Sequence, residues 1–346
     1  MATAFITGVA GPVLAADERA FVRDADPWGL ILFKRNIQST QQVAALTADF
    51  RSITGRADAP VLVDQEGGRV QRLGPPVWSA YPAGAAYGAL YDDDPAQGLA
   101  AARLGARLIA ADLHAVGITV DCLPLADVPV AGSHDVIGDR AYGREAVKVA
   151  RIARAIAEGL ADGGVLPVLK HLPGHGRAGA DSHHQLPVVD ASRKALEESD
   201  FAAFRALADL PLGMTAHVVY TAIDGGEPAT TSAQVIAEVI RGWIGFDGAL
   251  MSDDLSMHAL AGTMRERAAA SLRAGCDLLL HCNGKMDEMR DVAQEAPSLS
   301  GEAGRRTKAA LSRQNNPQPV DLAEARLAFS TMMARVRGSG DSVLIV

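Results

Sequence analysis

Cysteine is scarce in this chain, and long apolar runs are missing from it. Three cysteines occur among 346 residues, Cys122, Cys276 and Cys282, and their spacing fits neither a metal-binding motif nor a disulfide framework. We expect them to be buried free thiols in a reducing compartment. No window of about 18 residues is both apolar and uncharged, so we expect no membrane span. No basic region precedes the short apolar run at the N-terminus, so we expect no signal peptide and a cytoplasmic location.

An excess of positive charge is also missing. The 33 Lys and Arg residues stand against 41 Asp and Glu residues, which gives a formal net charge of −8. This balance argues against a general partner role for nucleic acid or an anionic membrane. Apolar residues at 48% and charged residues at 21% are ordinary values for a globular protein, which excludes disorder, collagen and coiled coil as the main architecture.

Short apolar runs alternate with longer amphipathic stretches along the chain. The runs that predict strands are Ala4–Val9, Leu30–Phe33, Val61–Val63, Thr119–Cys122, Val165–Lys170, Gly213–Ala216, Ala249–Ser252 and Asp277–His281. The stretches with helical spacing are Gln41–Ile53, Gly98–Val116, Ala146–Asp162, Arg193–Ala208, Ala233–Trp243 and Met264–Ala274. Strict alternation favours parallel strands joined by helices. Eight units in about 290 residues favour a (β/α)8 barrel over an open doubly wound sheet.

We therefore expect an α/β protein in which residues 1–346 form a single (β/α)8 TIM barrel domain. No linker or low-complexity tract divides the chain, and no Gly-x-Gly-x-x-Gly follows the first strand, which disfavours dinucleotide binding. The polar segment Asn283–Asp321 is expected to be a surface connection. Residues 322–336 predict a C-terminal helix that packs on the barrel.

Polar residues gather at the predicted carboxyl ends of the strands, where a TIM barrel holds its active site. These residues are Asp64 and Arg72 after strand 3, Asp127 and Arg140 after strand 4, Lys170, His171, His175, Asp181, His183 and His184 after strand 5, His217 after strand 6, Asp253 and Asp254 at the end of strand 7, and His281 and Asn283 at the end of strand 8. Loops are polar by default, but six polar strand ends around one rim indicate a functional site.

Two features supply groups that could react. Asp181 lies two residues before His183, so the carboxylate could orient the imidazole and make a general acid/base; the alternative is a turn cap beside an exposed histidine. Asp253 could act as a carboxylate nucleophile. Its neighbour Asp254 is expected to hold the local structure as a cap.

Other polar residues could bind hydroxyl groups. Asp64 and Arg72 could grip a polyol, or they could form a surface ion pair of little energetic weight. Lys170 and His171 lie at the carboxyl end of an apolar strand. A buried lysine at such a position usually has an anionic or hydroxyl partner, which favours a binding role.

Three functions fit these residues. Glycoside hydrolysis needs a carboxylate, an acid/base and donors for sugar hydroxyls, and all three are present. A metal-dependent hydrolase could take its ligands from the set His171, His175, His183, His184, His217 and Asp253, but no His-x-His or His-Glu-x-x-His motif occurs. A non-catalytic sugar-binding module would leave the acid/base pair without a role. We therefore favour the glycosidase and expect no metal and no cofactor.

Four motifs carry a family resemblance. Asp64–Arg72 (DQEGGRVQR), Lys170–Gly176 (KHLPGHG), Asp181–His183 (DSH) and Ser252–Met257 (SDDLSM) resemble glycoside hydrolase family 3, and more closely its bacterial β-N-acetylhexosaminidases of the NagZ type. The order and spacing match from about Phe5 to Cys282. Each motif alone is moderately specific, whereas the four in order are highly specific.

The resemblance implies a retaining mechanism. Asp253 would form a covalent glycosyl-enzyme, and His183, paired with Asp181, would be the acid/base. The residues that would bind the terminal N-acetylglucosamine are Asp64, Arg72, Arg140, Lys170 and His171.

The implied partner is a small carbohydrate or muropeptide. The implied reaction releases N-acetylglucosamine from peptidoglycan-derived 1,6-anhydro-muropeptides in cell-wall recycling. A phosphate-accepting glycosidase of the same family stays an alternative, and the sequence does not fix the oligomeric state. The second sandwich domain of many family members is not expected here.

Overall fold

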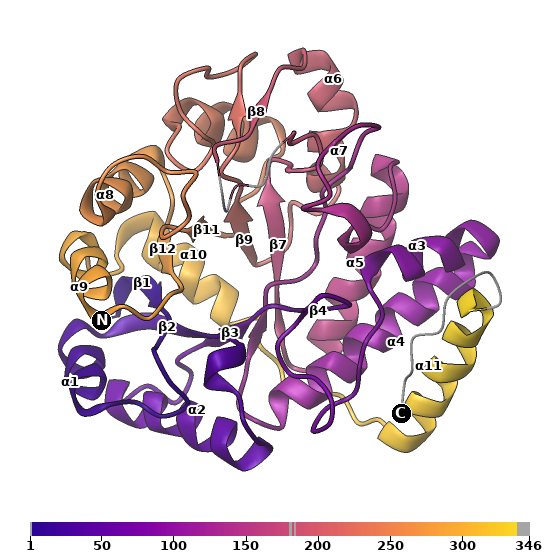
Figure 1. Ribbon diagram of the computed structural model, residues 1–346, viewed down its shortest axis with the longest axis horizontal. Helices are drawn as coiled ribbons and strands as arrows, with labels where there is room; N and C mark the ends of the chain where they lie inside the picture. Colours follow the sequence, from indigo (N-terminus) through magenta and orange to yellow (C-terminus); the bar gives the residue numbers. More distant parts are fainter. Residues whose placement is uncertain (1, 180–181, 183–184, 338–346) are drawn as a thin grey trace.

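Eight parallel strands close into a barrel at the centre of the molecule (Figure 1). The structure is a computed structural model, and it describes residues 2–179, 182 and 185–337. In spatial order the barrel strands are β1 (Thr3–Thr7), β12 (Leu278–His281), β11 (Ala249–Asp254), β9 (Leu212–Thr215), β7 (Leu166–Leu172), β6 (Val120–Asp121), β3 (Val61–Val63) and β2 (Pro27–Leu32). Every strand run expected from the sequence overlaps one of these, so the expected TIM barrel is confirmed.

Helices surround the barrel on its outer face (Figure 1). They are α1 (Ala16–Ala25), α2 (Thr40–Thr54), α3 (Gly84–Asp93), α4 (Pro95–His114), α5 (Ala146–Asp162), α6 (Arg193–Glu198), α7 (Asp200–Arg205), the π-helix η3 (Val235–Trp243), α8 (Met264–Ala274), α9 (Met286–Glu295), α10 (Gly301–Leu311) and α11 (Leu322–Arg337). Single 3-10 turns lie at η1 (Lys34–Asn36) and η2 (Gly138–Arg140).

The barrel strands are apolar throughout because both of their faces are covered. One face packs inside the barrel, where Ile6, Ile31, Val120 and Met214 belong to a single buried cluster. The other face packs against the helices in a larger cluster. Such strands appear in the sequence as continuous apolar runs, and for this reason they can be predicted from it.

Local signals set the helix ends. At α8, Thr263 and Glu266 form a reciprocal capping box, and Gly275 ends the helix in the left-handed conformation. At α4, the Asp94 side chain accepts from two backbone amides of the first turn, and Pro95 occupies the first helical position. The signals at α8 explain why this helix has the bounds expected from the sequence.

The expectation for Asn283–Asp321 was wrong. The segment contains α9 and α10, and it is not a plain surface connection. Each of these helices buries few side chains, Met289 and Val292 in α9 and Thr307 and Ala310 in α10. An apolar stripe this narrow gives a helical periodicity that is too weak to predict a helix from the sequence.

Two short additions lie at the carboxyl ends of the barrel strands. An antiparallel hairpin of β4 (Gln65–Gly67) and β5 (Val70–Gln71) follows β3 directly. A parallel pair joins β8 (Val188–Val189) to β10 (Val219–Tyr220). Among the residues described, no helix is long and apolar enough to cross a membrane.

Candidate active site

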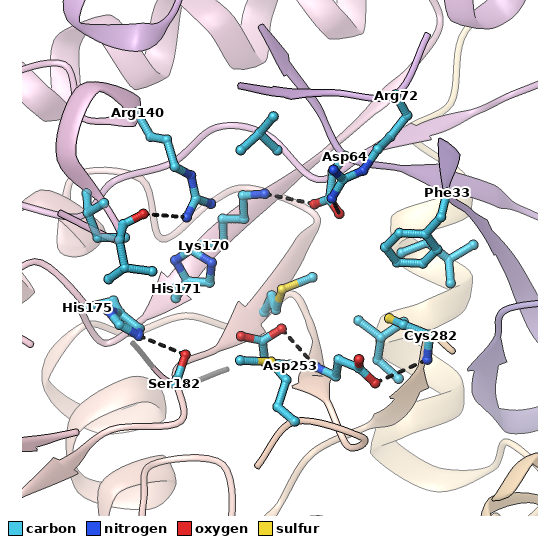
Figure 2. A pocket seen from close by; sticks show the side chains of 18 residues that line it. Phe33, Asp64, Arg72, Arg140, Lys170, His171, His175, Ser182, Asp253 and Cys282 are labelled. Atoms are coloured by element: carbon cyan, nitrogen blue, oxygen red, sulfur yellow. Dashed lines mark hydrogen bonds and ion pairs between the residues drawn. The ribbon is translucent and has the colours of Figure 1, made fainter. Parts of the chain in front are cut away.

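A pocket opens at the carboxyl ends of the barrel strands (Figure 2). Its lining contains Ile31, Phe33, Asp64, Val70, Arg72, Val136, Ile137, Arg140, Lys170, His171, His175, Ser182, Met214, Asp253, Asp254, Met257, Leu280 and Cys282. The structure therefore brings together all five residues expected to bind substrate, and it places them around one cavity with Asp253.

The hairpin after β3 brings Asp64 and Arg72 together although eight positions separate them. The buried amide of Gln65 holds the hairpin closed, because its Oε1 accepts from the backbone amides of Arg72 at 2.9 Å and Leu73 at 3.0 Å. Arg72 Nη2 then donates to Asp64 Oδ2 at 3.2 Å. Both side chains are partly buried in the pocket wall, so the pair is not the exposed surface ion pair weighed as the alternative.

A row of alternating charges runs along this wall, in the order Arg72, Asp64, Lys170, Glu66 and Arg140. Lys170 Nζ lies 3.0 Å from Asp64 Oδ1 and 2.5 Å from Glu66 Oε1. Arg140 Nε and Nη2 donate to the two oxygens of Glu66 at 2.8 and 2.7 Å in a bidentate pair. We call these five residues the charge row.

Opposite charges keep the charge row ionised in spite of its burial. Burial alone would raise the pKa of Asp64, but the nearby Lys170 and Arg72 outweigh it and hold that pKa below its usual value. Burial would likewise raise the pKa of Glu66, and Arg140 and Lys170 together lower it strongly. Burial would lower the pKa of Lys170, and the two carboxylates raise it above its usual value. The row therefore presents fixed N–H donors at neutral pH.

Sequence reasoning missed Glu66 as a residue of the site. Glu66 is buried and does not line the pocket itself, yet it contacts two residues that do. The signal was its place inside the DQEGG motif, between the end of a strand and a turn, where a carboxylate needs a buried cation.

Asp127 is a second residue whose part the sequence did not reveal. It is fully buried in the loop after β6, and its Oδ2 lies 2.7 Å from His171 Nδ1. Its Oδ1 accepts from the backbone amide of His175 at 2.6 Å. Burial would raise the pKa of Asp127, but His171 outweighs it and lowers that pKa. Asp127 thus fixes the ring of His171, which lines the pocket.

Asp253 lies at the end of β11, across the pocket from Asp64 and Arg140 (Figure 2). Its backbone amide donates to Thr215 Oγ1 at 3.2 Å, and its Oδ1 accepts from the backbone amide of Asp254 at 2.8 Å. The carboxylate of Asp254, which also lines the pocket, accepts from the backbone amides of Ser256 at 3.0 Å and Cys282 at 3.1 Å. Asp254 therefore holds the local structure, as its sequence position indicated.

His217 holds the backbone next to Asp253 through two hydrogen bonds. Its Nε2 lies 3.0 Å from the carbonyl oxygen of Asp254, and its Nδ1 lies 2.7 Å from Thr230 Oγ1. Because a carbonyl can only accept, Nε2 carries the proton, and Nδ1 accepts from the Thr230 hydroxyl. Burial lowers the pKa of His217, which agrees with a neutral ring. Thr230 also contacts Thr215 at 2.7 Å, so one buried network holds the backbone of Asp253 and Asp254.

Asp181, His183 and His184 lie outside the residues that the structure describes. Ser182 is described, and it lines the pocket. Its hydroxyl lies 3.2 Å from His175 Nε2, and its carbonyl oxygen accepts from the backbone amide of Ala259 at 3.2 Å. Ser182 therefore joins the strand-5 loop to the loop that follows Asp253.

The described residues offer no cluster of three or more His, Cys, Asp or Glu side chains placed to hold a metal ion. Of the possible ligands, His217 is engaged by Thr230 and a carbonyl, and His171 by Asp127. Donors for hydroxyl groups and a carboxylate across the pocket are the arrangement that carbohydrate hydrolysis uses.

Comparison with known proteins places this site in a family context. Residues 9–313 match the family model described as glycosyl hydrolase family 3 N terminal domain. A β-hexosaminidase of Alkalilimnicola ehrlichii is 43% identical over 280 residues, which cover 80% of this chain and 79% of the relative. A β-hexosaminidase of Bordetella parapertussis is 39% identical over 307 residues, 86% of each chain.

Solved structures show the same likeness. NagZ from Neisseria gonorrhoeae, crystallised with N-trifluoroacetyl-D-glucosamine, is 32% identical, with a TM-score of 0.84 over 97% of this chain and 98% of that chain. A glycoside hydrolase family 3 β-N-acetylglucosaminidase from Paenibacillus sp. is 32% identical, with a TM-score of 0.78 over 99% of this chain and 63% of that chain.

Proposed function

The chain belongs to glycoside hydrolase family 3 and is a β-N-acetylhexosaminidase, and from this premise we propose that it is a retaining enzyme with Asp253 as its nucleophile. The observation that carries this proposal is the position of Asp253 across one pocket from the charge row (Figure 2). A sugar whose hydroxyls contact the row would present its ring to that carboxylate.

In the first step an oxygen of Asp253 bonds to the anomeric carbon as the bond from that carbon to the leaving oxygen breaks. The bonding electrons go to the leaving oxygen, which takes a proton from His183. In the second step water attacks the anomeric carbon and gives its proton to His183, and the Asp253 carboxylate departs. Two displacements return the sugar with its original stereochemistry. Asp181 would orient His183 and stabilise its protonated ring.

We propose that the charge row and His171 bind a terminal N-acetylglucosamine. The row offers N–H donors from Arg72, Arg140 and Lys170, and the Asp64 carboxylate can accept from a hydroxyl. That the gonococcal relative was crystallised with N-trifluoroacetyl-D-glucosamine supports this choice of sugar.

The natural substrate would be a 1,6-anhydro-muropeptide, as the NagZ-type resemblance implies. The reaction would then belong to cell-wall recycling in the cytoplasm. We also propose that the 346 residues act as one catalytic domain, since all site residues proposed here come from the barrel and its loops.

Replacement of the nucleophile tests this proposal. We expect Asp253→Asn to lower kcat on an aryl N-acetyl-β-glucosaminide by at least about a thousandfold, because the amide cannot form the glycosyl-enzyme. Asp190→Asn, which changes an exposed aspartate, is the control and should keep normal turnover. The stereochemistry of the released sugar is followed by NMR. Turnover near the normal rate in Asp253→Asn, or an inverted product, would refute the assignment.

The same assay identifies the acceptor. A panel of aryl leaving groups is run with and without inorganic phosphate, and the products are separated. A hydrolase forms free sugar at an unchanged rate in phosphate, whereas a phosphate-accepting enzyme forms a sugar phosphate.

A further inference from the structure

Glu66 lies behind the pocket wall and pairs with two cations of the charge row. Its side chain is 5% exposed, and it is absent from the pocket lining, whereas Arg140 and Lys170 both line the pocket. One carboxylate thus holds two of the cations that face the ligand, while Asp64 holds Lys170 and Arg72 from the other end.

We propose that Glu66 is a positioning residue that also sets the specificity of the pocket for an uncharged sugar against anions. The inference deepens the proposed function and rests on it, because it assumes that the charge row binds sugar hydroxyls. Two properties of Glu66 carry it, the placement of donors and the balance of charge.

Placement follows from the hydrogen-bond geometry. The bidentate pair uses Nε and one N–H of Nη2, so the guanidinium of Arg140 is held in one plane. Its Nη1 also donates to the carbonyl oxygen of Val136 at 3.3 Å. The ammonium group of Lys170 contacts Asp64 and Glu66 through two of its three N–H groups, which leaves one N–H group for a ligand. The remaining donors of both cations therefore have fixed directions before a sugar enters.

Charge balance follows from the composition of the row. Three cations alternate with two carboxylates, so the row carries a net charge of about +1 at neutral pH. Without the charge of Glu66 the row would carry a net charge of about +2 beside a partly buried pocket. In that low-dielectric setting an uncompensated cation attracts small anions strongly. Glu66 thus leaves donors for neutral hydroxyls without making an anion site.

The test compares three variants of the full-length protein. Glu66→Gln removes the charge and keeps the size. Glu66→Asp keeps the charge and shortens the reach by one methylene. Asp277→Asn is the matched control, because Asp277 is also buried and also pairs with two arginines, Arg241 at 2.7 Å and Arg306 at 3.2 Å, but it lies at the opposite end of the barrel, before β12.

Two readouts are measured, the Kd for N-acetylglucosamine and the inhibition constant for sulfate against aryl glycoside turnover. For Glu66→Gln we expect the sugar Kd to rise about tenfold or more, and sulfate to become a competitive inhibitor at concentrations at least about tenfold lower than for the unmodified protein. For Glu66→Asp we expect the sugar Kd to rise without a gain in sulfate inhibition. Asp277→Asn should change neither constant, although it should lower the melting temperature.

Sulfate inhibition separates this proposal from a purely structural role, since loss of folding does not create an anion site. A folded Glu66→Gln variant with unchanged sugar Kd and unchanged sulfate inhibition would overturn it. If Glu66→Gln does not fold, Glu66→Asp decides the matter, and a normal sugar Kd there would overturn it. If the unmodified protein does not bind N-acetylglucosamine, the proposed function fails first, and the two failures are distinguishable.

Discussion

The histidines of the pocket differ in the partners that hold them. His171 contacts a buried carboxylate, Asp127, at 2.7 Å, whereas His217 contacts a hydroxyl and a carbonyl. His175 contacts the hydroxyl of Ser182, and burial, followed by the nearby His171, lowers its pKa to about 4. Burial disfavours the protonated ring, and it lowers the pKa of both His175 and His217.

His175 predicts a pH dependence of stability. Its pKa of about 4 in the folded protein lies below the usual 6.5, so the unfolded chain takes up the proton first as the pH falls. The stabilisation is therefore complete above pH 6.5 and is lost as the pH falls toward 4. We expect the stability of the unmodified protein relative to His175→Gln to fall by roughly 2 kcal/mol between pH 7 and pH 5.

Urea unfolding at the two pH values measures this change. His114→Gln, which replaces an exposed histidine at the end of α4, is the control and should show no such difference. A pH-independent difference for His175→Gln would mean that His175 titrates normally in the folded state.

Residue types at strand ends were predictable, and their partners were not. The sequence placed Asp64, Arg72 and Lys170 at one rim, because strand ends converge there in a barrel. It could not show that Glu66 faces inward or that Asp127 meets His171, 44 positions away. Such contacts depend on how a loop crosses the barrel mouth, and no periodicity encodes that path.

At the scale of elements, the β4–β5 hairpin supports one wall of the pocket. Its turn requires glycine at position 67, where φ is +93° and an added Cβ would lie 2.2 Å from the carbonyl oxygen of Pro82. Neither the backbone angle nor the space suits a side chain there. The rigid turn holds Glu66, the preceding residue, against Arg140 and Lys170.

Gly67→Ala is therefore expected to do more than strain the backbone. We predict a loss of more than about 2 kcal/mol in the free energy of unfolding, together with a raised KM, because the hairpin must move away from Pro82. Gly55→Ala is the matched control, since Gly55 also has a positive φ, +66°, but its added Cβ meets nothing within 4 Å. It should cost about 1 kcal/mol and leave KM unchanged. Equal losses in the free energy of unfolding in the two variants would show that the hairpin can shift to make room for the added methyl group.

Elements differed in how well the sequence revealed them. The sequence predicts helix α5 with its observed bounds because this helix buries a broad apolar stripe. It predicts a surface connection where α9 and α10 lie, because these two helices bury narrow stripes. α10 nevertheless contributes Ala310 to the core inside the barrel. A polar helix that covers a barrel end needs few apolar contacts, and its sequence therefore resembles a loop.

At the scale of the whole molecule, charge is distributed unevenly. The chain carries a net charge of −8, yet one wall of the pocket holds three cations. Many of the acidic residues form ion pairs outside the pocket, such as Asp247 with Arg305 and Arg306. The net charge of the chain therefore says little about a site in which three cations share two carboxylates.

The last helix, α11, closes the outer layer far from the pocket. It lies beside α3 and α4 (Figure 1). Phe329 is 5% exposed, and its ring centroid lies 6.4 Å from those of Tyr81 and Tyr87. Arg326 donates to Asp112 on α4 at 2.7 Å. None of these side chains lines the pocket, so α11 should support stability rather than substrate binding.

Phe329→Ala tests this separation of stability from binding. We expect it to lower the free energy of unfolding by about 3–5 kcal/mol, because it removes a buried ring and leaves a cavity between two tyrosines. Leu327→Ala on the same helix changes a side chain that is 70% exposed and should stay within about 0.5 kcal/mol of the unmodified protein. Both variants should keep a normal KM for an aryl N-acetyl-β-glucosaminide below their melting temperatures. A raised KM in Phe329→Ala would mean that α11 transmits its packing to the barrel mouth through Tyr81, which follows the β4–β5 hairpin and contacts Gly68 through its carbonyl oxygen at 2.8 Å.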